Sequence, residues 1–80
     1  MSILIEKIEL KDKILVYLNS GDVFSLPYDY TSLLSKSTKE SLENYHLIGG
    51  GRGVHFEDID EDISLRGIIQ YKLKHDLIAS

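Results

Sequence analysis

The chain has 80 residues, with one proline and no cysteine or tryptophan, and its formal net charge at pH 7 is −4. This length fits one small domain, 1–80, and the lack of cysteine excludes disulfides and cysteine-based zinc sites. A balance of 9 basic against 13 acidic residues excludes the strongly basic type of nucleic-acid binder.

No segment approaches the roughly 20 apolar residues of a membrane-spanning helix. Residues 1–13 mix charges with Ile and Leu and carry no apolar core of signal-peptide length. We therefore expect a cytoplasmic protein with no membrane partner. The apolar fraction of 42% is too high for a disordered chain, so the chain should fold.

The N-terminal part of the chain is expected to form three strands. Residues 3–10 are rich in Ile and alternate between apolar and polar side chains in their second half, which indicates a first strand. Residues 14–18 are continuously apolar, which is typical of a central strand. A third strand over 22–27 should end at Pro27, which has no backbone hydrogen to donate to a neighbour.

The turn between the second and third strands is expected to set their register. We predict a three-residue loop over 19–21 with Gly21 in the left-handed conformation. A two-residue loop over 20–21 brings the apolar side chains together less well. The predicted opposite pairs are Leu18 with Asp22, Val16 with Phe24, and Ile14 with Leu26.

The middle of the chain is expected to be a loop followed by a short helix. Residues 28–34 are of mixed character and favour a loop with one helical turn. Ser37 followed by Glu40 forms a capping box, which predicts a helix over 38–45. The inward side chains are expected to be Leu33 or Leu34 in the loop, and Leu42 and Tyr45 in the helix.

Two short apolar runs, 46–48 and 54–56, flank a glycine cluster and predict a hairpin. We expect the glycines of 49–53 to form a wide turn with positive φ at several positions. Arg52 offers an alternative interpretation as an exposed anion-binding cation. The phosphate-loop motif requires a lysine and the dinucleotide motif requires a following helix, so the turn is favoured.

The acidic segment, residues 57–62, holds five of the 13 carboxylates and no base, whereas the rest of the chain has a balance of +1. A helix should begin after it at Leu65, with Ser64 or Asp62 as N-cap. Residues 71–80 either extend this helix or form a flexible tail. Its apolar stripe, which closes the domain or binds a second subunit, consists of Leu65, Ile69, Leu73 and Leu77.

These elements together predict an α+β fold with a mostly antiparallel sheet. The sheet is expected to contain the three N-terminal strands and the hairpin. A short middle helix and a C-terminal helix complete the domain.

Two segments of the chain carry a resemblance to a known family. They read YHLIGGGRGVHF at 45–56 and IDEDISLRGII at 59–69. A Gly-containing hairpin and a Ser/Thr-Lys-Glu helix start precede them. Over about residues 12–70, the chain therefore resembles the bacterial family called domain of unknown function 2442. In many members a tryptophan stands at the position of Phe56, and a Leu-Asp-Glu-Asp-Ile-Ser segment follows.

The resemblance implies a small bacterial protein or module for which no catalytic residues are established. Many members lie beside a second small family, domain of unknown function 4160, in a layout like that of a toxin–antitoxin pair. Some members are fused to a helix-turn-helix domain. No such domain is recognisable in these residues, so we expect no direct contact with nucleic acid.

The acidic segment also has a calcium interpretation, because Asp58, Asp60 and Asp62 occupy the first, third and fifth positions of an EF-hand loop. The match then fails, since Ile63 stands where Gly is required and Ile69 stands where Glu is required. We instead expect solvated carboxylates, one of which caps the helix, with the intervening isoleucines facing inward.

His46 and His55 are expected to face each other across the predicted hairpin, with Asp58 as a conceivable third metal ligand. Two histidines alone do not make a zinc site. We interpret them as polar residues on the outer face of the hairpin, and no metal site and no cofactor are predicted.

An enzyme is not expected, because no nucleophile with a positioned base is recognisable and a domain of this size has little room for a substrate cavity. We expect a protein-binding module, an antitoxin-like partner of a neighbouring small protein or of a second copy of the chain, with no small-molecule substrate. Two alternatives stay open: a metal-dependent hydrolase using Asp58, Asp60 and His55, and an accessory subunit of a transcriptional regulator. The candidate partner-binding residues are Asp58, Asp60, Glu61, Asp62, Arg52, Leu73 and Leu77.

Overall fold

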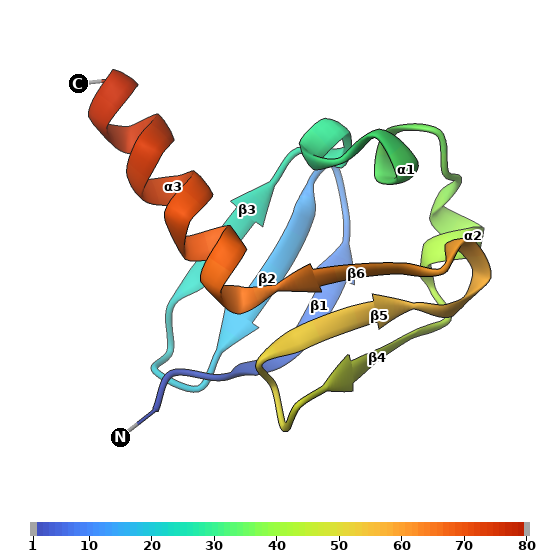
Figure 1. The fold of residues 1–80 in the computed structure, drawn as a ribbon, viewed down its shortest axis with the longest axis horizontal. Coiled ribbons are helices and arrows are strands. Elements are labelled where there is room, and N and C mark those ends of the chain that lie inside the picture. Colours follow the sequence, from blue (N-terminus) through green and yellow to red (C-terminus); the bar gives the residue numbers. More distant parts are fainter. Residues whose placement is uncertain (1, 80) are drawn as a thin grey trace.

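Two three-stranded antiparallel sheets form the protein in the computed structural model, which describes residues 2–79, with side chains from 2 to 75. The strand orders are β1-β2-β3 and β4-β5-β6, and α3 follows the second sheet (Figure 1). The predicted α+β fold with antiparallel strands is confirmed, but six strands form two sheets where the sequence pattern predicts five strands in one sheet. The elements are β1 (Ile5–Leu10), β2 (Ile14–Leu18), β3 (Val23–Leu26), η1 (Tyr28–Tyr30), α1 (Ser32–Ser35), α2 (Lys39–Leu42), β4 (Tyr45–Ile48), β5 (Gly53–Phe56), η2 (Glu57–Ile59), β6 (Glu61–Ser64) and α3 (Leu65–Ala79).

The first sheet has the predicted register. Gly21 has a φ of +93°, and the Leu18 amide donates to the Asp22 carbonyl at 2.9 Å, which closes the three-residue turn. β3 ends one residue before Pro27, as expected. The predicted cross-strand pairs are formed, Ile14 with Leu26 and Val16 with Phe24.

Short helical turns connect the two sheets. Thr31 caps α1 by accepting a hydrogen bond from the Leu34 amide at 3.1 Å. Leu34 is fully buried, whereas Leu33 is 45% exposed. Of the two leucines that the sequence offers, Leu34 therefore belongs to the core.

The prediction of a helix over 38–45 capped by Ser37 is wrong in both the cap and the length. Its N-cap is Thr38, whose hydroxyl accepts from the α2 backbone at 3.2 Å, because the Ser37 hydroxyl already donates to a carbonyl of α1 at 2.6 Å. The helix has only four residues, and Tyr45 begins β4 instead. Tyr45 still turns inward, and its hydroxyl lies 3.3 Å from the amide and 3.1 Å from the carbonyl of Ile8 on β1.

The predicted hairpin around the glycine cluster is confirmed. β4 and β5 are antiparallel, and three consecutive glycines, 49–51, have positive φ. The Gly51 carbonyl accepts from the Ile5 amide at 2.8 Å. A Cβ added to Gly51 would lie 2.7 Å from the Ile5 carbonyl oxygen. The turn therefore anchors the second sheet to β1 at a point where only glycine fits.

The acidic segment contains structure that the sequence reasoning missed. After η2, Asp60 adopts a left-handed conformation with φ 50°, and the chain returns as β6 beside β5. A strand in which only Ile63 is apolar gives little periodicity to recognise. Ser64, the last residue of β6, caps α3 by accepting from the Gly67 amide at 3.0 Å. The alternative cap, Asp62, is wrong because it lies three residues before the start of α3 and its carboxylate contacts His55.

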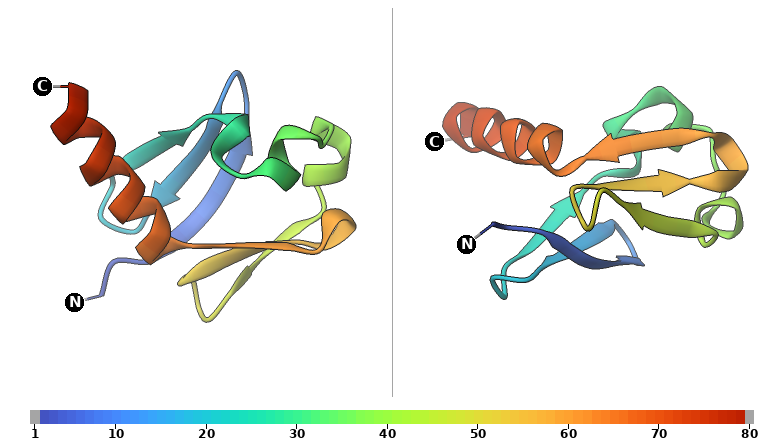
Figure 2. Two further views of the ribbon diagram at one scale, coloured as in Figure 1. Left: turned by 45° about the horizontal axis from the view of Figure 1, so that its top comes forward. Right: turned by 60° about the horizontal axis from the view of Figure 1, so that its bottom comes forward.

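The two sheets pack around one apolar core, and the right-hand view of Figure 2 shows them as two layers. Both sheets, α1, α2 and α3 contribute to it. The buried apolar residues are Ile5, Ile8, Ile14, Val16, Leu18, Leu26, Leu34, Leu42, Val54, Phe56, Ile63, Leu65 and Ile68.

The final helix closes the domain with its first turns and then projects away from it (Figure 1). Leu65 and Ile68 are buried, Ile69 is half-buried, and Leu73 is 60% exposed. Residues 71–79 are helical, and the side chain of Leu77 lies outside the described residues. In the part of the chain that the structure describes, no helix has both the length and the apolar character to cross a bilayer.

Candidate functional site: a histidine–carboxylate cluster

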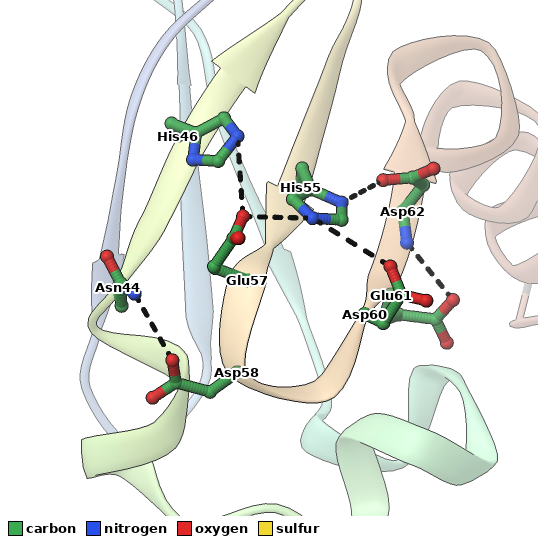
Figure 3. Close-up of polar contacts among 8 residues, drawn as sticks. All are labelled: Asn44, His46, His55, Glu57, Asp58, Asp60, Glu61 and Asp62. Atoms are coloured by element: carbon green, nitrogen blue, oxygen red, sulfur yellow. Dashed lines mark hydrogen bonds and ion pairs between the residues drawn. The ribbon is translucent and has the colours of Figure 1, made fainter.

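Two histidines and an aspartate form a row across the outer face of the second sheet. The register places His46 opposite His55, and His55 opposite Asp62. Side chains alternate between the faces of a strand. Because Val54 and Phe56 on either side of His55 are fully buried, His55 must point outward. The predicted facing of the two histidines is confirmed, with ring centroids 5.1 Å apart (Figure 3).

Asp62 orients the His55 ring. Its Oδ1 lies 2.5 Å from His55 Nδ1, and because an ionised carboxylate only accepts hydrogen bonds, Nδ1 carries the hydrogen. This hydrogen bond raises the pKa of His55 above its ordinary value of 6.5. Desolvation opposes the rise, and the charges of Asp62, Glu57 and Asp60 add to it. In the neutral ring, Nε2 keeps a lone pair that can bind a proton or a metal.

Glu57 and Asp60 bring carboxylates to the other nitrogen of His55. Because η2 turns the chain directly after β5, Glu57 Oε2 lies 3.3 Å from His55 Nε2 and 4.0 Å from His46 Nε2. Asp60 Oδ1 lies 4.0 Å from His55 Nε2. Potential ligand atoms of His46, His55 and Glu57 all lie within 4.8 Å of one another. We call the five side chains the histidine–carboxylate cluster: His46, His55, Glu57, Asp60 and Asp62.

The remaining acids of the segment lie outside this cluster. Asp58 turns toward Asn44, whose side-chain amide donates to it at 3.2 Å (Figure 3). Glu61 accepts from the Asp62 backbone amide at 3.1 Å. The hydrolase hypothesis requires Asp58 to lie beside His55, and the structure does not bring these two residues together. The three aspartates of the calcium interpretation also point to different neighbours, since Asp62 is engaged by His55.

The other candidate partner-binding residues lie beside α3. Arg52 precedes β5, at the end of the strand opposite to η2, and its guanidinium donates to the Gly49 carbonyl at 3.0 Å. It borders an open, mostly apolar cleft of about 330 Å³, beyond which Leu73 is exposed on α3. Arg52 also lines a second hollow with Asp62, so it lies between the acidic segment and α3. The cleft is lined by Arg52, Leu65, Arg66, Ile69 and Gln70.

The sequence pattern predicts the two facing histidines but not the carboxylates beside them. The pairing of His46 with His55 follows from the hairpin alone. The contacts of Glu57 and Asp62 require η2 and β6, which the sequence pattern does not predict. One weak signal was available, because Ile63 and Leu65 are apolar and two residues apart, as in a strand.

Comparisons with known proteins agree with this architecture. The sequence model of the family described as protein of unknown function (DUF2442) matches residues 7–73. A crystal structure of a protein of unknown function from Rhodospirillum rubrum is similar, with 25% identity, a TM-score of 0.79 and coverage of 88% of each chain. The solution NMR structure of the uncharacterized protein CV0863 from Chromobacterium violaceum has 23% identity and a TM-score of 0.75, over 84% of this chain and 64% of that chain. No curated protein matches the chain.

Proposed function

The chain belongs to the DUF2442 family of proteins of unknown function, and we propose that it is a small protein-binding module. Its docking surface in this proposal is the acidic segment, and its partner is a protein with a basic surface. The partner proposed first is a neighbouring small protein, which the chain would bind in the manner of an antitoxin.

The observation that carries the proposal is a concentration of carboxylates without basic partners. In the part of the chain that the structure describes, the ion pairs of the acidic segment involve only His46 and His55, and none involves a lysine or arginine. The Asp60 side chain is 97% exposed, and Glu57 and Asp62 are more than half exposed. Exposed carboxylates that repel one another are stabilised when a basic surface approaches them.

The acidic segment is held in place by the strands on both sides of it. β5 and β6 are paired along their whole length, and the Asp60 amide donates to the Glu57 carbonyl at 3.3 Å within the connecting turn. A preformed surface loses less conformational entropy on binding than a flexible one. Complementary charges also accelerate association, so this arrangement suits fast docking on a basic protein.

Capture of partners from the native cell tests the proposal. The tagged chain is compared with the double variant Asp58→Asn/Glu61→Gln, which removes two charges from the acidic segment and leaves the five side chains of the histidine–carboxylate cluster unchanged. We expect a captured protein with a basic surface, whose recovery is lower with the variant. Its recovery should also fall at high salt, because exposed charges are screened.

A matched double variant provides the control. Glu6→Gln/Asp12→Asn removes the same two kinds of charge from exposed positions on and after β1. The captured partner is purified, and its dissociation constants with the wild type and both variants are measured in EDTA. We expect weaker binding only for the variant in the acidic segment. Equal affinity for the two double variants would overturn the acidic segment as the docking surface.

A further inference from the structure

We propose that His46, His55 and Glu57 bind a divalent transition-metal ion of the Zn²⁺ class. The sequence alone predicts no metal site, and the third ligand it offers beside the two histidines, Asp58, faces Asn44 in the structure. The fold supplies that ligand by turning Glu57 back over the hairpin (Figure 3). This inference is independent of the docking proposal, since it concerns an ion bound by the chain alone.

One pair of donor atoms already has the spacing of a tetrahedral site. Zn–N and Zn–O bonds of about 2.0–2.1 Å place tetrahedral donors about 3.3 Å apart. His55 Nε2 and Glu57 Oε2 already have this separation, at 3.3 Å. His46 Nε2 lies 4.0 Å from the same oxygen, and its side chain is 55% exposed. The ligand atoms of all three residues lie within 4.8 Å of one another, so binding would require the exposed His46 ring to move closer to the other two.

The hydrogen bond from His55 to Asp62 is the arrangement that metal-ligating histidines use. Such histidines donate their second ring N–H to a carboxylate, a carbonyl or a water, which fixes the tautomer and the orientation of the ring. Asp62 accepts from Nδ1 of His55 at 2.5 Å, and Nε2 thereby faces Glu57. Asp62 is a positioning residue in this proposal and does not itself touch the ion.

The types of donor select the class of ion. Imidazole nitrogens with a carboxylate suit Zn²⁺ and its neighbours Co²⁺ and Ni²⁺, whereas Ca²⁺ and Mg²⁺ require mainly oxygen ligands. Asp60 Oδ1 lies 4.0 Å from His55 Nε2, but Asp60 is not among the residues whose ligand atoms all lie within 4.8 Å of one another. A water would therefore complete the tetrahedron.

Calorimetric titration of the metal-free full chain with Zn²⁺, together with the visible absorption of its Co²⁺ complex, tests this site. We expect one equivalent of Zn²⁺ and the absorption bands of tetrahedral Co²⁺. His46→Ala and Glu57→Gln should each weaken Zn²⁺ binding about tenfold or more. Asp62→Asn should weaken Zn²⁺ binding about 10–100-fold, as is typical when a residue that hydrogen-bonds to a metal ligand is changed.

Two variants serve as controls. His75→Ala removes the third histidine of the chain, which stacks on Tyr71 in α3, and Asp58→Asn removes the acid that faces Asn44. Both should bind Zn²⁺ like the wild type. Circular dichroism checks folding, and Glu57→Gln changes an exposed side chain only. Absence of one-equivalent binding to the wild type, or equal binding by the wild type and Glu57→Gln, would overturn the site and leave the docking test in EDTA unaffected.

Discussion

Asp62 and His55 lie opposite each other on adjacent strands, with the Asp62 carboxylate 2.5 Å from His55 Nδ1. The contact exists because the acidic segment folds back as β6 and pairs with β5. It fixes the tautomer of His55 and leaves Nε2 facing Glu57 at 3.3 Å. One cross-strand pair therefore connects the fold of the acidic segment to the chemistry of the histidine–carboxylate cluster.

Asp62→Asn should lower the pKa of His55 in the metal-free protein, because the hydrogen bond to the carboxylate is the main cause of its raised value. A raised folded pKa stabilises the protein fully below the unfolded value of 6.5, and this contribution is lost as the pH rises through the folded pKa. The advantage of the wild type over the variant in unfolding free energy should therefore shrink as the pH rises through that range. NMR titration of His55 and denaturant unfolding at several pH values measure both effects. A His55 pKa that is the same in both proteins would contradict the hydrogen bond between His55 and Asp62 as the cause of the raised pKa.

Gly51→Ala should destabilise the fold more than Gly50→Ala. Both residues have positive φ, which costs an alanine about 1–2 kcal/mol. A Cβ at Gly51 also lies 2.7 Å from the Ile5 carbonyl oxygen, whereas one at Gly50 meets nothing within 4 Å. Crowding should add about 1–3 kcal/mol at Gly51. Equal losses in denaturant unfolding would show that the turn does not press against β1.

Leu34→Ala and Leu33→Ala compare two adjacent leucines with opposite burial. Leu34 is fully buried and Leu33 is 45% exposed. Removal of the Leu34 side chain should cost about 2–5 kcal/mol of unfolding free energy, whereas the change at Leu33 should stay within about 0.5 kcal/mol. Thermal or denaturant unfolding of both variants decides this. A larger loss at Leu33 would mean that α1 presents its other face to the core.

Tyr45→Phe should expose the edge of β1 locally. The Tyr45 hydroxyl lies within hydrogen-bonding distance of both the amide and the carbonyl of Ile8, and its loss should cost about 1 kcal/mol. Amide hydrogen exchange at Ile8 should accelerate in this variant. Tyr28→Phe, which removes a hydroxyl bonded to the Lys11 carbonyl, should leave exchange at Ile8 unchanged. Unchanged exchange at Ile8 in Tyr45→Phe would argue against these hydrogen bonds between Tyr45 and Ile8.

The parts of the fold that the sequence predicts are those governed by short-range turn chemistry. Gly21 determines the β2–β3 register because a single left-handed residue closes that loop, and the apolar pairs of the two strands agree with it. The glycines of 49–51 determine the second hairpin in the same way. The facing of His46 and His55 then follows from the register alone.

The parts that the sequence does not predict depend on tertiary contacts. Tyr45 fits the spacing of a helix after Leu42, but its hydroxyl partner on β1 favours a strand. β6 has a single apolar position, and its pairing with β5 supplies the stability that its own sequence lacks. Glu57 and Asp62 contact His55 only because η2 and β6 fold back beside β5. The sequence pattern therefore does not predict the carboxylates of the cluster.

Nitrogen-15 NMR of the histidine rings during a Zn²⁺ titration shows whether His46 and an Asp62-oriented His55 present Nε2 to one shared ion. In the metal-free protein, at a pH above the raised pKa of His55, the neutral ring should carry its hydrogen on Nδ1. With one equivalent of Zn²⁺, the Nε2 signals of His46 and His55 should shift together while those of His75 stay in place. A neutral His55 ring with its hydrogen on Nε2 in the metal-free protein, or a Zn²⁺ response confined to His75, would contradict the shared site.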